Sequence, residues 1–355
     1  MPDPFAVGSN LSLNFVGSGV YSTVVDGRSS WRVFNLSGAG TTATFQDLTI
    51  QNGRVSGNGG GIYALGALSL TNVAVLSNAA INNHGGGIYA EGALTLTNVI
   101  VLSNTAGTAS GGGVYAKSVS ILNNVTLRNN TAGNGGGLFA NGVSTLNHLT
   151  VLTNTVVTAG GGVYANAQTS VAGSLFQGNL AGTANGNNGG GLYASNGIVT
   201  ISGAQFIGNL AYAGGGVAVT NSPAVVTDTQ FINNRSTQDG GGIYVNVNTL
   251  QATNSLFVGN ASSNGAAIYV VNDNNTTSRI RYVTIMSSTV GANAAIYKAY
   301  GGALDIRDTI ITSYTTAINV AGSGIPFTSD YNLFYNTNPN VVTGTHSISG
   351  TNPLF

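Results

Sequence analysis

Apolar and polar residues alternate along almost the whole chain, and the alternation restarts after short glycine-rich segments. In residues 59–78 the apolar residues that share a parity are Ile62 and Ala64, Leu68 and Leu70, and Val73 and Val75. A period of two is typical of short strands with one side buried, and no stretch shows the spacing of an amphipathic helix. The pattern therefore predicts three short strands in each such segment.

The segment is repeated. A triple glycine followed by Ile, Val or Leu begins at Gly59, Gly85, Gly111, Gly135, Gly160, Gly189, Gly214 and Gly240, with altered copies at Gly265 and Asn293. Residues 31–38 and 315–320 resemble an earlier and a later copy without the glycines. Three strands and three turns in about 25 residues form one coil of a parallel β-helix. We predict an all-β protein, a right-handed single-stranded parallel β-helix solenoid of roughly twelve coils.

The whole chain, residues 1–355, is expected to form one domain. Residues 1–30 would form an N-terminal coil or cap, 31–320 the regular coils, and 321–355 irregular C-terminal coils. Neither 1–30 nor 352–355 has the sequence of a capping helix, and an open β-helix leaves unpaired strand edges on its last coils. We expect that the chain is part of a longer protein or that its ends pair with other copies.

An asparagine closes each copy. These residues are Asn78, Asn104, Asn130, Asn154, Asn179, Asn209, Asn234 and Asn260. Stacked at one turn, their amides can bond to one another and to the backbone. The sequence predicts a structural Asn ladder and no ligand-binding role for these side chains. The glycines at the preceding corner allow close backbone approach and positive φ.

Composition excludes several classes of protein. Charged residues make up 6% of the chain, the net charge is +0, and there is no Cys. A nucleic-acid partner is excluded because phosphates require a basic stripe, and a disulfide framework because there are no thiols. No apolar run reaches the length of a membrane-spanning helix. Residues 1–10 lack the basic start and apolar stretch of a signal peptide, so an exported form would be mature or a fragment.

The repeats resemble those of a known family. The GGGI-type corners combine with Phe-x-x-Asn at Phe176–Asn179, Phe206–Asn209, Phe231–Asn234 and Phe257–Asn260. This combination resembles the repeats of bacterial polymorphic outer-membrane proteins and, more broadly, the pectate-lyase-like right-handed β-helix superfamily. The resemblance covers nearly the whole chain and implies an exported or cell-surface protein. It is specific for the fold rather than the function, because the same coils serve lyases, hydrolases, adhesins and passive stalks.

The charged residues do not form the clusters that polysaccharide lyases and hydrolases require. Paired carboxylates are needed to hold calcium or to divide acid and base roles, yet no acid lies between Glu91 and Asp228. The densest patch comprises Arg279, Arg281, Asp305 and Arg307, followed by Asp308. It is interpreted as a solvated face, with a degraded or unusual lyase site as the alternative. We expect cross-coil ion pairs between Glu91 and Lys117 and between Arg279 and Asp305.

No metal, cofactor or catalytic residue is predicted. The three histidines, His84, His148 and His346, occupy unlike positions in their copies. A shared zinc site is therefore not expected.

Two outward columns are candidate interaction surfaces. One comprises Tyr63, Tyr89, Tyr115, Phe139, Tyr164, Tyr193, Tyr244, Tyr269 and Tyr297, with Ala218 interrupting it. Its interpretation is a stacked ladder, and the alternative is a strip for a glycan or a partner subunit. The other is an apolar stripe formed by Leu76, Leu102, Leu152, Ile207, Ile232 and Val258. If the parity is right, this stripe marks an interface; if turn loops cover it, it does not.

These observations predict a non-enzymatic extracellular or cell-surface protein, a self-associating unit of a fibre, sheath or adhesin stalk. The alternative is a polysaccharide lyase or hydrolase, or a glycan-binding module, on the same fold. Ice binding through outward residues such as Thr95 and Thr97 is disfavoured, because later coils do not keep the pattern. The expected partner is a second copy of the chain or a polysaccharide.

Overall fold

The computed structural model describes residues 5–8, 10–288, 293–322, 324–340 and 344–350. Within these ranges the protein is all-β, without helices, and its parallel strands stack as a β-solenoid of about twelve turns, which confirms the predicted fold class. The chain divides into two compact units, and each is described by itself. Unit 1 contains Met1–Ser170 and Ser174–Ala181; unit 2 contains Val171–Gly173 and Gly182–Phe355.

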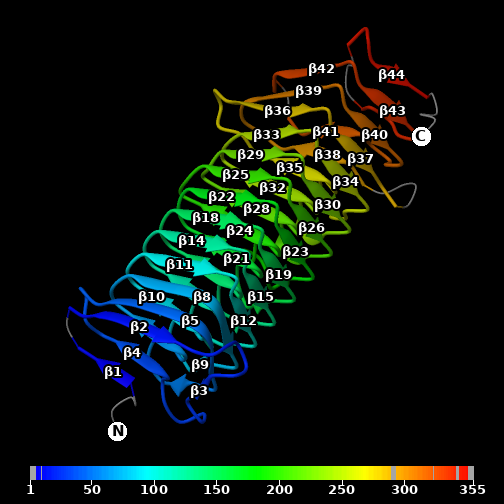
Figure 1. Ribbon diagram of the computed structural model, residues 1–355. Coiled ribbons are helices and arrows are strands. Elements are labelled where there is room, and N and C mark those ends of the chain that lie inside the picture. Colours follow the sequence, from blue (N-terminus) through cyan, green and yellow to red (C-terminus); the bar gives the residue numbers. More distant parts are fainter. Residues whose placement is uncertain (1–4, 9, 289–292, 323, 341–343, 351–355) are drawn as a thin grey trace. The chain divides into compact units, whose positions relative to one another are not determined.

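The first sheet of unit 1 consists of the strands that follow the glycine corners (Figure 1). Its strands are β1 (Phe5–Val7), β4 (Phe34–Leu36), β7 (Ile62–Ala64), β10 (Ile88–Ala90), β13 (Val114–Ala116), β17 (Leu138–Ala140) and β21 (Val163–Ala165). Neighbouring strands are parallel, and equivalent residues lie opposite one another: Ile88 pairs with Ile62 and with Val114. The segment 31–38, predicted to be an early coil, supplies β4, which pairs with β7.

The other two sides of unit 1 also consist of parallel strands. One side contains β2 (Ser12–Val16), the first half of β5 (Thr42–Gln51) and of β8 (Leu68–Leu76), β11 (Leu94–Thr97), β14 (Ser120–Asn123) and β18 (Ser144–Asn147). The other contains β3 (Val24–Asp26), the second half of β5 and β8, β12 (Ile100–Leu102), β15 (Thr126–Arg128), β19 (Thr150–Leu152) and β23 (Leu175–Gln177). Short strands pair beyond the asparagines: β6 (Arg54–Val55), β9 (Ala79–Ala80), β16 (Thr131–Ala132) and β20 (Thr155–Val156).

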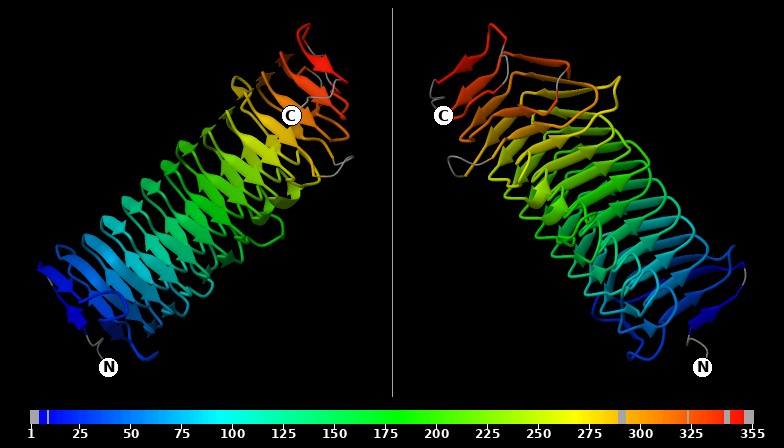
Figure 2. Two further views of the ribbon diagram at one scale, coloured as in Figure 1. Left: turned by 45° about the vertical axis from the view of Figure 1, so that its right-hand side comes forward. Right: turned by 180° about the vertical axis from the view of Figure 1, so that it is seen from behind.

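Unit 2 repeats the same three sides (Figure 2). The first contains β24 (Leu192–Ser195), β28 (Val217–Thr220), β32 (Ile243–Asn246), β35 (Ile268–Val270), β38 (Ile296–Lys298) and β41 (Ile318–Val320). The second contains β25 (Val199–Ser202), β29 (Ala224–Thr227), β33 (Leu250–Thr253), β36 (Thr277–Arg281), β39 (Ala303–Arg307) and β42 (Phe327–Asp330). The third contains β26 (Gln205–Ile207), β30 (Gln230–Ile232), β34 (Leu256–Val258), β37 (Thr284–Met286), β40 (Ile310–Thr312), β43 (Leu333–Tyr335) and β44 (Ile348–Ser349).

The remaining strands are β27 (Leu210–Ala213) and β31 (Arg235–Asp239), which pair beyond the asparagines of unit 2, and β22 (Thr169–Ala172), which contains residues of both units. Residues 315–320, predicted to be a late coil, supply β41, which pairs with β38.

The interior of each unit is filled by the inward-facing residue of every strand. In unit 2, Phe206, Phe231 and Phe257 are fully buried, and their rings stack with centroids 5.1 and 4.7 Å apart. The parity read from the sequence therefore places the correct residues in the core. Burying a side chain of this size contributes about 1.5–3 kcal/mol.

The chain turns at three corners in each regular coil, and each corner has a residue with positive φ. The first is the glycine of the triplet, such as Gly111 with φ 74°, where an added Cβ would lie 2.5 Å from the carbonyl oxygen of Val114. The other two corners are formed in unit 1 by residues such as Asn98 (φ 55°) and Ser103 (φ 58°). Asn tolerates this conformation better than other residues with side chains.

The closing asparagines are buried at the third corner, each 2% exposed or less. In unit 1 the amide Nδ2 of Asn104 donates to Oδ1 of Asn130 at 3.0 Å, and the backbone N–H of Asn104 donates to the same oxygen at 2.9 Å. The same arrangement joins Asn78 to Asn104, Asn130 to Asn154, and, in unit 2, Asn209 to Asn234 and Asn234 to Asn260. Each asparagine thereby satisfies buried backbone and side-chain groups of the neighbouring coil.

Candidate functional site

The aromatic column lies on the outer side of the first sheet in each unit. In unit 1 the rings of Tyr63, Tyr89, Tyr115, Phe139 and Tyr164 are stacked with successive centroids 5.3, 5.2, 5.1 and 4.6 Å apart. In unit 2 the rings of Tyr244, Tyr269 and Tyr297 stack in the same way, and Tyr193 pairs in register with the fully buried Ala218. Because neighbouring rings cover one another's faces, the column presents ring edges and hydroxyl groups rather than ring faces.

Burial perturbs these tyrosines. Desolvation is the largest cause, and it raises the pKa of Tyr244 to about 12 and the pKa values of Tyr89, Tyr115 and Tyr269 as well. The hydroxyl of Tyr89 donates to the Glu91 carboxylate, which also forms the predicted ion pair with Lys117 at 2.5 Å. That ion pair is confirmed, but both partners are exposed, so its contribution to stability is small.

The apolar stripe is half-exposed in both units. Leu76 pairs in register with Leu102 in unit 1, and Ile207 with Ile232 and Ile232 with Val258 in unit 2, while Leu152 occupies the same position of β19. The intervening residue of each strand, such as Val101 or Phe231, is fully buried. The stripe therefore faces outward and is not covered by turn loops among the described residues.

The charged patch forms a bonded network on the outer side of β36 and β39. Asp305 accepts from Nη2 of Arg281 at 2.5 Å and from Nε of Arg307 at 3.1 Å. Arg279 lies opposite Asp305 in register but forms no ion pair within the described residues, so the predicted Arg279–Asp305 pair is wrong. The longer diagonal reach of Arg281, whose side chain is 23% exposed, replaces it.

The network determines the charge state of Asp305. Burial alone would raise the pKa of this carboxyl, but the hydrogen bond and charge of Arg281, followed by those of Arg307, outweigh burial and lower it. A carboxylate held in its ionised form by two guanidinium groups is poorly suited to act as a general acid. It instead fixes Arg281 and Arg307, which lie opposite each other in register.

We expect Asp305→Asn to destabilise the protein by about 1–3 kcal/mol, because two charge-assisted hydrogen bonds are weakened and two arginines remain side by side. Urea denaturation at pH 7 measures the change. Asp308→Asn, at an exposed carboxylate three residues away, is the control and should change stability by less than about 0.5 kcal/mol. Since the pKa of Asp305 is lowered from 3.8, the difference between Asp305→Asn and the parent should shrink as the pH falls below that value. A pH-independent difference would contradict this explanation.

Two groups near the patch could not be read from the repeat. Asp330 of β42 lies opposite Arg307 and accepts from Nδ1 of His346 at 3.0 Å. The imidazole ring of His346 stacks on Tyr331 with a centroid distance of 4.5 Å. Residues 330 and 346 are joined by an irregular segment, so no periodic signal brought them together.

Lys298 is the other unpredicted feature. It is the last residue of β38, points inward and is fully buried. Its Nζ donates to the carbonyl oxygens of Tyr300 and, at 3.1 Å, Gly301. Burial lowers the pKa of this amine to about 8. The alternation Ile296-Tyr297-Lys298 was a usable signal, because it assigns Lys298 to the same side as the buried Ile296.

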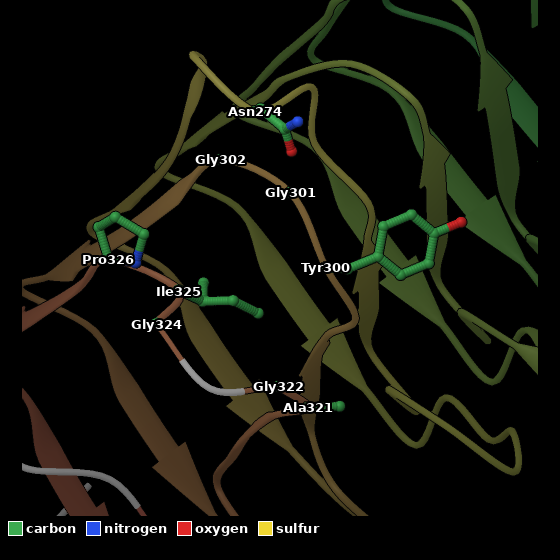
Figure 3. A pocket seen from close by; sticks show the side chains of 9 residues that line it. All are labelled: Asn274, Tyr300, Gly301, Gly302, Ala321, Gly322, Gly324, Ile325 and Pro326. Carbon is green, nitrogen blue, oxygen red and sulfur yellow. The ribbon is translucent and has the colours of Figure 1, made fainter.

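A cavity of about 290 Å³ lies beside the carbonyls that Lys298 binds. It is lined by Asn274, by glycines of two turns and by Ile325 and Pro326 (Figure 3). The ring of Tyr300, which also borders it, points away from the other lining residues (Figure 3). Its lining is mostly backbone and contains no acid or base. Among the described residues, no group of three or more His, Asp or Glu side chains is placed to hold a metal ion.

Comparison with known proteins identifies the repeat. Residues 228–246 match the Chlamydia polymorphic membrane protein (Chlamydia_PMP) repeat. This segment contains Phe231–Asn234 and the glycine corner at Gly240, so the resemblance of these motifs to polymorphic membrane protein repeats is confirmed, and it suggests a protein associated with the cell surface.

Two further comparisons complete the picture. No curated protein matches the chain. Among solved structures, the A-module of the mannuronan C-5 epimerase AlgE6 from Azotobacter vinelandii is similar, with 12% identity, a TM-score of 0.34, and coverage of 98% of this chain and 84% of that one. No helix among the described residues is long and apolar enough to span a membrane.

Proposed function

We propose that the protein is a non-enzymatic structural element of the cell surface, a self-associating unit of a fibre, sheath or adhesin stalk. The observation that supports it best is the aliphatic face of unit 2, formed by Ile207, Ile232, Leu256, Val258 and Met286 on the outer side of β26, β30, β34 and β37. These residues are half-exposed or exposed, and the other outward residues of these strands, Gln205, Gln230 and Thr284, carry no charge. A contiguous apolar surface of this kind favours association.

The size of the face indicates what kind of association to expect. Four strands spaced about 4.8 Å apart and three residues long give an area of roughly 200 Å². A stable dimer needs about 800 Å² per partner. A single contact of this face is therefore weak, and many repeated contacts are needed, as in a fibre or sheath where weak contacts add. The polymorphic membrane protein repeat supports the surface location.

Self-association is tested by sedimentation velocity and electron microscopy of the full chain over a range of concentrations. We expect assembly that increases with concentration, and the double variant Ile207→Lys/Ile232→Lys should weaken it at least tenfold by placing two charges on the aliphatic face. The matched control is Thr200→Lys/Val225→Lys, which changes outward residues of the same two coils on another side.

The outcomes separate clearly. Monomers at all concentrations would contradict self-association. Equal effects of the two double variants would show that net charge, rather than this face, controls assembly. The polysaccharide lyase or hydrolase alternative predicts product release from uronate polymers, which should be lost on Asp305→Asn; its absence supports the structural role.

A further inference from the structure

A second cavity of unit 2, about 400 Å³ in volume, lies at the corner between β39 and β40 and between β42 and β43. Asp308, Tyr331 and His346 supply its polar and aromatic lining, and Ile310, Leu333 and Ile348 its apolar lining. The volume is within the range of small-molecule sites. We propose that this corner pocket binds one sugar unit of a glycan, either neutral or carrying an amino group. The inference goes beyond the structural role and does not depend on self-association.

The aromatic wall of the pocket differs from the aromatic column. Tyr331 is 53% exposed and stacks on His346 with an interplanar angle of 2°. Among the described residues no third ring stacks on this pair, so one face of each ring is not covered by another ring. Sugar rings have an apolar C–H face that packs against such a surface, as apolar groups generally do on aromatic rings.

The imidazole is held in place by Asp330. The carboxylate accepts from the backbone N–H and from Nδ1 of His346, both at 3.0 Å. With the proton of the neutral ring on Nδ1, Nε2 carries the lone pair and can accept a hydrogen bond from a sugar hydroxyl. Asp330 thus acts as a positioning residue, because it fixes both the orientation and the tautomer of the ring.

Asp308 is the acid of the pocket, and its carboxylate has no partner among the described residues. The acids at the equivalent corner of other coils do have one: Asp47 accepts from Nδ2 of Asn72 at 3.0 Å, and Asp228 from Nδ2 of Asn254 at 2.5 Å. The residue that follows Asp308 in this corner column is Tyr331, which has no amide to donate. The carboxylate therefore keeps its acceptor capacity for a ligand.

These groups define the class of ligand. Two acceptors, the carboxylate of Asp308 and Nε2 of His346, suit a ligand rich in hydroxyl donors, and the carboxylate also suits an ammonium group. The apolar lining and the aromatic pair suit the C–H face of a pyranose ring. A uronate is disfavoured, since its carboxylate would lie against Asp308. A neutral hexose or a hexosamine satisfies all of these features.

The test is ligand-observed NMR on the full chain with methyl glycosides of glucose, galactose, N-acetylglucosamine and glucosamine, and with methyl glucuronide and tetramethylammonium as comparisons. We expect millimolar binding of at least one neutral or amino glycoside, weakened at least tenfold by Tyr331→Ala and by Asp308→Asn. Tyr282→Ala is the matched control: Tyr282 occupies the same corner one coil earlier, is 62% exposed and does not line the pocket. This variant should bind as the parent does.

Several results would overturn the proposal: no glycoside binding, a preference for glucuronide, equal binding of tetramethylammonium, which would indicate a site for cations, or the same loss in Tyr282→Ala. In the parent protein the ring protons of His346 should shift on glycoside addition, a readout that needs no variant to fold. Sedimentation of Tyr331→Ala should remain unchanged, so that failure of sugar binding and failure of self-association are distinguishable.

Discussion

Asn130→Ala should destabilise the protein by about 3–5 kcal/mol, the largest effect that we expect from a single polar substitution. The substitution removes four hydrogen bonds: two that Oδ1 of Asn130 accepts from Asn104, one that Nδ2 donates to the carbonyl of Val101 and one to Oδ1 of Asn154. The donors of Asn104 and the carbonyl of Val101 remain buried. Each buried group left unsatisfied costs about 1–3 kcal/mol.

Urea denaturation measures the effect, and Asn123→Ala is the control. Asn123 faces outward from β14 and accepts one hydrogen bond from Nδ2 of Asn147, at 3.0 Å. Its loss should cost less than about 1 kcal/mol because water can replace it. If the two variants were equally stable, the Asn ladder would not contribute in the way that its geometry indicates.

The stability of the protein should increase from pH 8 to pH 9.5 by about 2 kcal/mol because of Lys298. Burial lowers the pKa of Lys298 from 10.5 to about 8. Between these values the unfolded chain binds one more proton than the folded chain at this residue, so the free energy of unfolding increases with pH. Above pH 10 the buried tyrosines, whose pKa values are raised, act in the opposite direction, so the measurement ends below that pH.

Lys298→Met should abolish this increase, because the substitution keeps the length and apolar character of the side chain without the amine. The control is Lys117→Met, which removes an exposed lysine and should leave the pH dependence unchanged. Denaturant unfolding of the three proteins at each pH provides the comparison. An increase that persists in Lys298→Met would show that another group is responsible.

The repeating part of the fold follows from sequence because one rule applies at every coil. A period of two assigns Phe231 and Val101 to the interior, and a glycine triplet or an asparagine marks two of the three corners. The remaining corner was not predicted, since Asn98, His148 and Tyr282 all occupy it with positive φ and share no residue type. There the backbone conformation is imposed by the stacking of coils rather than by local preference.

The candidate sites follow from sequence only where they obey the repeat. Register alone places Arg279 opposite Asp305, yet the ion pair forms with Arg281, because a long flexible side chain is not confined to its register position. The pairing of Asp330 with His346 depends on an irregular turn and has no periodic signal. Lys298 could have been identified by parity, but its copy otherwise reads as an ordinary Ile-Tyr strand.

The in-register pairing of like residues has a consequence for how such a chain changes over generations. Each coil of unit 1 contributes one residue to every column: Tyr89 lies between Tyr63 and Tyr115, and Asn104 bonds to Asn78 and Asn130. Loss of residues 85–110 by recombination between neighbouring repeats would set Tyr63 opposite Tyr115 and Asn78 beside Asn130, with no column broken. A loss of one residue within a strand would instead turn its core side chains outward. Such a gene can therefore change the number of coils in whole steps while the cross-section of the protein stays constant.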